Sequence, residues 1–142
     1  MATHEDANLI LRLYELRRET VLRQARNWFV RDFHPTSAAS IMDVLKSEQS
    51  AFFRMVTTYW EMAATLVVHG TIDAELFHES NGEHLYVYAK LAPYVAELRQ
   101  LYNNKRLVFN LEKLVLSMPD CANLIKAMQE RQAGAAAARG GR

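Results

Sequence analysis

The chain has 142 residues, of which half are hydrophobic and 23% are charged, a composition typical of a folded protein rather than a disordered one. This length fits one domain and allows a hydrophobic core without disulfide or metal staples. Lys and Arg number 17 and Asp and Glu number 16, a net charge of +1 that argues against a dedicated nucleic-acid binder.

The sequence also bears on the compartment of the protein. Its single cysteine, Cys121, has no partner for an internal disulfide. The first residues lack the basic and apolar regions of a secretory signal. The uncharged stretch from Met62 to Ile72 is far shorter than the ~20 apolar residues of a membrane span. We therefore expect a cytoplasmic protein without a membrane span.

Turn residues are scarce, with five Gly and three Pro, and this scarcity predicts long helices with few connections. We expect an all-α, single-domain helical bundle of five to seven helices over residues 1–132. Residues 133–142, rich in Ala, Gly and Arg, have nothing to bury and are expected to form a flexible tail.

The first predicted helix runs from Glu5 to Asp32, with Thr3 as its N-cap. One apolar stripe at helical spacing faces the core. A second strip, formed by Leu9, Leu13 and Leu16, lies to one side and suggests contact with a second neighbour or a partner chain.

The most apolar helix is predicted from Ser50 to His69, with Gly70 just beyond its end. A short helix capped by Thr36 or Ser37 precedes it. Nearly all sides of the 50–69 helix are apolar, which is typical of the most buried helix of a bundle.

Four further helices are predicted over residues 74–79, 83–102, 105–117 and 120–132, and Thr71 or Asp73 caps the first of them. Pro93 lies inside the second of them, where it removes the hydrogen bond to the Ala89 carbonyl. The apolar residues before and after the proline follow one helical spacing. We therefore expect one long helix kinked at Pro93.

A possible metal-ligating unit is the Glu-x-x-His pattern of Glu75 and His78, followed by Glu79. Di-iron bundles need two such units and two further glutamates, and no other glutamate is followed by histidine at this spacing. His69 and His84 lie nearby in the sequence but lack the His-Glu-x-x-His spacing of zinc sites. These residues therefore define only an alternative hypothesis, a bundle that binds a metal or a small ligand.

Glu61 lies on the most apolar helix, so its carboxylate must be paired or reach solvent. Arg31 and Arg99 are candidate partners from other helices, and we expect a structural ion pair. The sequence contains neither a Gly-x-Ser-x-Gly motif nor a Gly-rich phosphate loop, so no enzyme activity or cofactor is expected.

Three segments of the chain share a pattern with other proteins: residues 7–18, residues 59–77, and residues 91–99 with the sequence LAPYVAELR. In these segments the chain resembles a family of small, uncharacterised bacterial helical proteins, described as a domain of unknown function. The resemblance covers residues 5–117 and implies a soluble helical domain. It includes Glu61, Gly70, Asp73, Pro93 and Arg99, but it implies no reaction and no catalytic residue.

The sequence favours a non-enzymatic interaction module that self-associates or binds a protein partner. This hypothesis depends on the second apolar strip of the first helix. Metal or small-ligand binding through Glu75, His78 and Glu79 remains the alternative.

Overall fold

The computed structural model describes residues 1–140, which form an all-α fold. The helices are α1 (His4–Arg17), α2 (Thr20–Arg31), α3 (Ala38–Leu45), α4 (Ser50–Val68), α5 (Ala74–Ser80), α6 (Glu83–Leu91), the 3-10 turn η1 (Ala92–Tyr94), α7 (Val95–Leu101), α8 (Phe109–Leu116) and α9 (Cys121–Gly140). The predicted all-α class is confirmed, while the described residues contain more helical segments than the expected five to seven.

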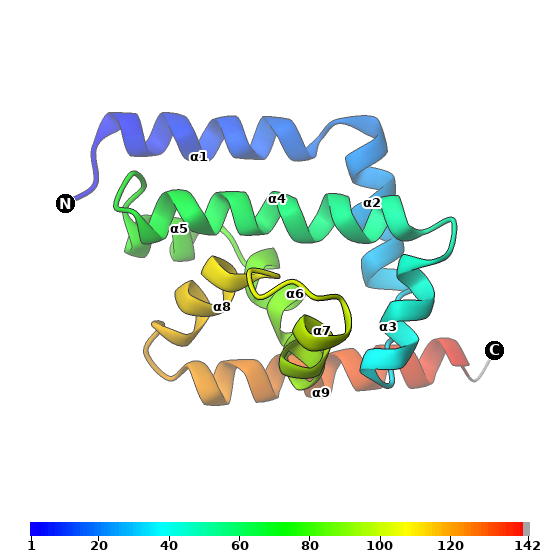
Figure 1. Ribbon diagram of the computed structural model, residues 1–142. Coiled ribbons are helices and arrows are strands. Elements are labelled where there is room, and N and C mark those ends of the chain that lie inside the picture. Colours follow the sequence, from blue (N-terminus) through cyan, green and yellow to red (C-terminus); the bar gives the residue numbers. More distant parts are fainter. Residues whose placement is uncertain (141–142) are drawn as a thin grey trace.

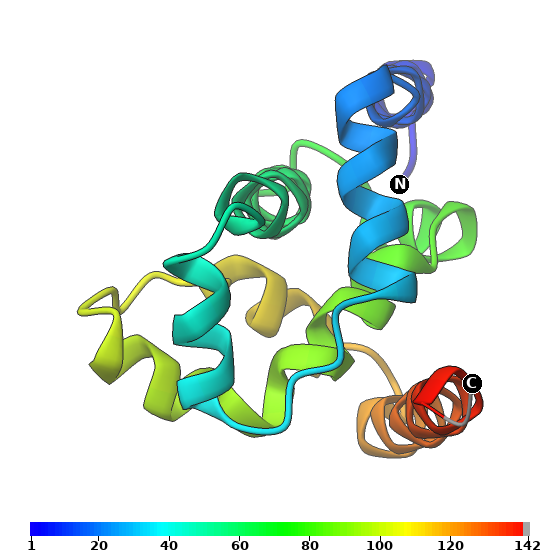
Figure 2. The same ribbon diagram turned by 90° about the vertical axis from the view of Figure 1, so that its right-hand side faces the viewer.

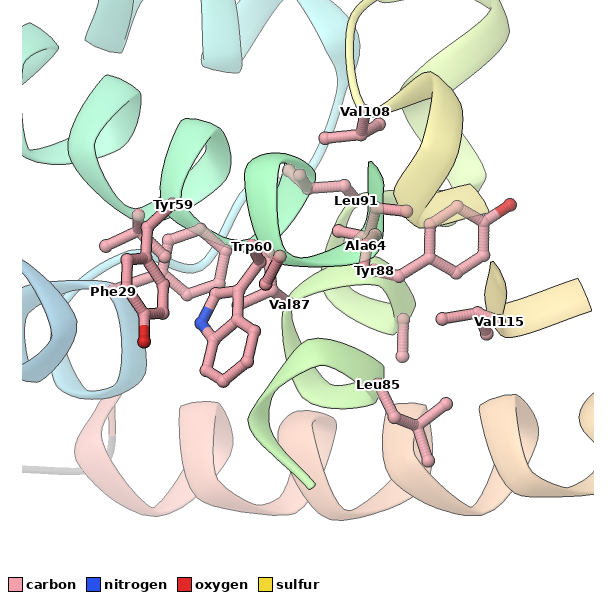
Figure 3. Packing of buried hydrophobic residues seen from close by; sticks show 14 of the residues in the cluster. Phe29, Tyr59, Trp60, Ala64, Leu85, Val87, Tyr88, Leu91, Val108 and Val115 are labelled. Carbon is pink, nitrogen blue, oxygen red and sulfur yellow. The ribbon is translucent and has the colours of Figure 1, made fainter. Parts of the chain in front are cut away.

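Helix α4 is the centre of the fold, as its apolar pattern predicted. In Figure 1, the axes of α1, α4 and α9 are roughly parallel in successive layers, with α4 running in the opposite direction to the other two, and Figure 2 shows the same three helices nearly end-on. Helices α2 and α8 pack extensively on α4, and α3, α5 and α6 also contact it. Trp60, 1% exposed, lies between α4 and α6, with Phe29 of α2 nearby (Figure 3).

The predicted helix from Glu5 to Asp32 is wrong, because the chain breaks between α1 and α2. Glu19 accepts hydrogen bonds from the backbone N–H groups of Val21 (3.0 Å) and Leu22 (2.9 Å) and so caps α2. These two bonds lower the pKa of the Glu19 carboxyl. The break lets α2 turn away from the line of α1 and run beside the end of α4 (Figure 1).

Pro93 interrupts the predicted 83–102 helix as a single turn of 3-10 helix. The chain passes from α6 through η1 into α7 without an intervening loop. The break is therefore at the expected residue, but it separates two α-helices where we expected one kinked helix.

Several helix ends follow from local side chains, as predicted. Thr3 and Ser37 form capping boxes at α1 and α3, and Asp73 caps α5 through the backbone N–H of Leu76 at 2.9 Å. Gly70 ends α4 with a φ of 81°, a left-handed conformation that favours glycine.

The last two helices differ from the prediction at their ends. Helix α8 begins at Phe109, four residues later than predicted, after Val108 with a φ of 46°. Helix α9 continues to Gly140, beyond its predicted end at residue 132, so the segment expected to form the tail is helical up to Gly140. Residues 141–142 of the predicted tail lie outside the described part of the chain.

No helix among residues 1–140 is both long enough and apolar enough to cross a lipid bilayer.

Candidate functional site

The residues of the Glu-x-x-His pattern do not converge. Glu75 and Glu79 are exposed on α5, whereas His78 turns towards α6. Over residues 1–140, no three His, Cys, Asp or Glu side chains are placed to hold one metal ion. The structure therefore offers no support for the metal site considered from the sequence.

His78 instead pairs with His84 of α6. The His78 Nδ1 and His84 Nε2 atoms are 3.0 Å apart, and the two rings stack with centroids 5.2 Å apart. His84 is 1% exposed, and its Nδ1 has no hydrogen-bond partner. Burial, the nearby His78 and the charge of Arg17 lower the pKa of His84 to about 3. Burial also lowers the pKa of His78, and it therefore favours the neutral form of both imidazoles.

Glu61 and Arg99 do not pair with each other. The Glu61 carboxylate accepts hydrogen bonds from the backbone N–H groups of Asn110 (3.0 Å) and Leu111 (2.8 Å). These groups belong to the first turn of α8, where the helix dipole favours a negative charge. Arg99 forms its ion pair with Glu112, at 3.1 Å between Nη1 and Oε1. Both side chains are thus structural, with partners other than those expected.

The apolar strip proposed as an interaction surface is largely used inside the fold. Leu13 is 6% exposed and belongs to the core, and Leu9 packs against that core. Leu16 alone remains open, at 42% exposed. The strip therefore holds α1 on the bundle and leaves little surface for a partner.

A polar network at the junction of α2, α4 and α6 was not predicted. Arg26 binds Glu83 through two hydrogen bonds, from Nε to Oε2 (2.8 Å) and from Nη2 to Oε1 (2.9 Å). The Trp60 indole N–H also donates to Glu83 Oε2, at 2.8 Å. Because both oxygens of Glu83 are occupied, this carboxylate is a fixed anchor rather than a free base.

Arg17 extends the network from α1. Its guanidinium lies over the rings of Tyr14 (5.0 Å) and Trp60 (5.5 Å) and donates to the Asn81 side chain at 3.2 Å. Nothing local in the sequence indicates that α1 would bring Arg17 over Trp60 or that α2 would bring Arg26 to Glu83.

A groove of about 550 Å³ opens beside Glu83, between α2, α6 and α9. We call it the α2–α6–α9 groove, and it is lined by Val30, Gly82, Glu83, Tyr86, Met128, Arg131, Gln132 and Ala135. Val30, Tyr86, Met128 and Ala135 present apolar or aromatic surface, whereas the charged groups are the anchored Glu83 and Arg131. Such a lining suits an apolar side chain or a short apolar ligand.

Lys90 of α6 is 6% exposed, and its Nζ lies 4.9 Å from the centroid of the Tyr86 ring. Its ammonium donates to the carbonyls of Phe29 (2.7 Å) and Phe33 (2.9 Å), at the end of α2. Burial lowers the pKa of Lys90 to about 8. The lysine therefore closes the C-terminus of α2, where carbonyl groups favour a cation.

Comparison with known proteins identifies the region of the chain that is shared with others. A family model described as a domain of unknown function, DUF4760, matches residues 2–118. No curated protein and no solved structure matches the chain significantly. The match includes α1 to α8 and ends before α9.

Proposed function

Because the chain belongs to the DUF4760 family, whose description assigns no activity, we propose its function from the geometry: a non-enzymatic, cytoplasmic interaction domain. In this proposal the α2–α6–α9 groove binds an apolar segment of a protein partner. The observation that carries it is an apolar groove whose walls are held rigid on two sides. Near-neutral net charge favours a protein over a nucleic acid as the partner.

The groove is fixed by contacts on its α6 wall. Glu83 is tied to α2 by Arg26 and to α4 by Trp60. Gln132 of α9 is 8% exposed and donates to the Tyr86 carbonyl at 2.8 Å. A groove that already has its shape loses little conformational entropy when it binds, which favours affinity.

Val30 gives a direct test, because it lines the groove and is 39% exposed. We expect Val30→Glu to weaken partner binding about tenfold or more, since it places a carboxylate against an apolar contact. Val21→Glu is a matched control: Val21 lies on the same helix, is 44% exposed and does not line the groove. The measurement is quantitative recovery of partners from the native host by the wild type and both variants.

The proposal is supported if a protein is recovered equally by the wild type and Val21→Glu and is lost with Val30→Glu. Equal recovery by all three chains would refute it, as would the absence of any recovered protein. Thermal melts of both variants check that folding is intact.

A small apolar molecule is the second candidate for the same groove, because its volume lies in the range of ligand pockets, roughly 300–1,000 Å³. Native mass spectrometry of the purified chain distinguishes the two. A bound small molecule displaced by Val30→Glu but not by Val21→Glu would favour the ligand over the protein partner.

A further inference from the structure

The face of α6 under α9 contains a backbone carbonyl that α6 cannot satisfy. In a regular helix the Ala89 carbonyl would accept from the N–H group of residue 93, but that residue is proline. Ala89 is 0% exposed, so its carbonyl requires a donor from another element. Gln129 of α9 supplies it, with 3.1 Å between its Nε2 and the Ala89 oxygen.

A second amide of α9 makes the same kind of contact one helical turn away. Gln132 Nε2 donates to the Tyr86 carbonyl at 2.8 Å. The two glutamines are three residues apart on α9, and the two carbonyls are three residues apart on α6. This face of α6 therefore matches a helix that presents Gln-x-x-Gln.

The remaining contacts between α9 and the bundle are modest. Met128 is 9% exposed, and Ile125 packs against the core. Near the end of α9, Arg139 pairs with Asp32 at 3.2 Å, but both side chains are largely exposed. Because an exposed pair contributes little, the two part-buried amide contacts determine much of the selectivity of α6 for α9.

The connection to α9 is short and ends on a residue in a left-handed conformation. Residues 117–120 link α8 to α9, and Asp120 has a φ of 61°. This conformation favours glycine, although aspartate adopts it at less cost than most other residues, and short hinges of this kind favour exchange of the element that follows them.

We propose that the α6 face carrying the Tyr86 and Ala89 carbonyls is a helix-docking site for Gln-x-x-Gln, and that it accepts the α9 helix of a second copy. Two chains then exchange their C-terminal helices, with every α6–α9 contact kept and the Asp120 hinge opened. Exchange needs no new surface, since the occupant is the segment already bound within one chain. This inference does not rest on the α2–α6–α9 groove as a partner site.

The test of selectivity uses the full chain and a labelled synthetic peptide of residues 121–140. The double substitution Gln129→Glu with Gln132→Glu replaces both donors by isosteric carboxylates. It therefore weakens the docking of the chain's own α9 on α6. We expect this double variant to bind the wild-type peptide at least about tenfold more tightly than the wild-type chain does, because its site is vacated. Fluorescence anisotropy measures both affinities.

Two matched controls isolate the amides from the charge change. Gln24→Glu with Gln100→Glu alters the chain's charge equally at two exposed glutamines and should bind like the wild type. A peptide with Lys126→Glu changes charge by the same amount and should still bind, whereas a peptide with both glutamines replaced should not. Should the double variant lack a cooperative melt, Gln129→Glu alone is used in the same comparison.

Exchange itself is measured by light scattering after refolding at high concentration. We expect the wild type to contain a species of twice the chain mass. Asp120→Gly should contain less of this species, because glycine adopts the left-handed conformation of the closed hinge more readily. The double glutamate variant should lack it. Val30→Glu should keep it, which separates this result from the proposed function. A monomeric wild type, or equal binding of all peptides, would overturn the proposal.

Discussion

Acidification is expected to destabilise the protein through His84, by about 3 kcal/mol between pH 7 and pH 4. The pKa of His84 is about 3 in the folded protein and 6.5 as its ordinary value, so the unfolded chain binds the proton first. Stability is therefore present above pH 6.5 and is lost progressively as the pH falls towards 3. The physical reason is that an imidazolium at 1% exposure would lack water and would face His78 and Arg17.

Urea denaturation across this pH range measures the effect, and His84→Leu isolates it from the titration of carboxylates. The leucine cannot titrate and removes a buried nitrogen that has no partner, so the pH dependence should flatten by about the same 3 kcal/mol. His69→Leu, at an exposed histidine, should keep the wild-type slope. Identical slopes for the wild type and His84→Leu would show that His84 is not the group responsible.

Removing the carboxylate of Glu61 is expected to cost about 3 kcal/mol, because α8 has no N-cap of its own. Val108 precedes the helix without a side-chain cap, and Glu61 of α4 binds two of the free N–H groups instead. Hydrogen bonds to a charged group contribute ~1.5–3 kcal/mol, and their loss leaves both donors unsatisfied. Glu61→Ala should thus lower the urea midpoint with little change in slope.

Two further variants show whether the charge at this place is the cause. Glu61→Gln keeps one acceptor oxygen and should lose roughly half as much stability. Glu79→Ala removes an exposed carboxylate of α5 and should change the free energy of unfolding by less than about 0.5 kcal/mol. Hydrogen exchange at the Asn110 and Leu111 amides should accelerate in Glu61→Ala. Unchanged exchange at these amides would contradict the capping role.

Local chemistry was enough to predict several parts of this fold. The all-α class and the burial of α4 follow from apolar spacing, which depends on residues three and four apart. The caps at Thr3, Ser37 and Asp73 and the end of α4 at Gly70 depend on contacts within one turn. Each of these features is decided by neighbours in the sequence.

The candidate site was not predictable in the same way, because its partners come from distant residues. Glu61 was recognised as a carboxylate that needs a partner, but its partners are backbone groups 49 and 50 residues away. Nothing in the sequence indicated the contacts that Glu83 makes, since an acidic residue in a first helical turn is usual. Its contacts with Arg26 and Trp60 depend on how three helices meet.

By itself, the amino-acid sequence determined which segments are helical and which of their faces are apolar. Both properties depend on neighbouring side chains and on the backbone. Only the tertiary structure decided that Glu61 of α4 caps α8 and that Gln129 of α9 satisfies the carbonyl that Pro93 leaves free. The break between α1 and α2 is local, since Glu19 accepts from N–H groups two and three residues further along the chain. A buried polar group requires some partner, but packing chooses which one, and that choice involves the whole chain.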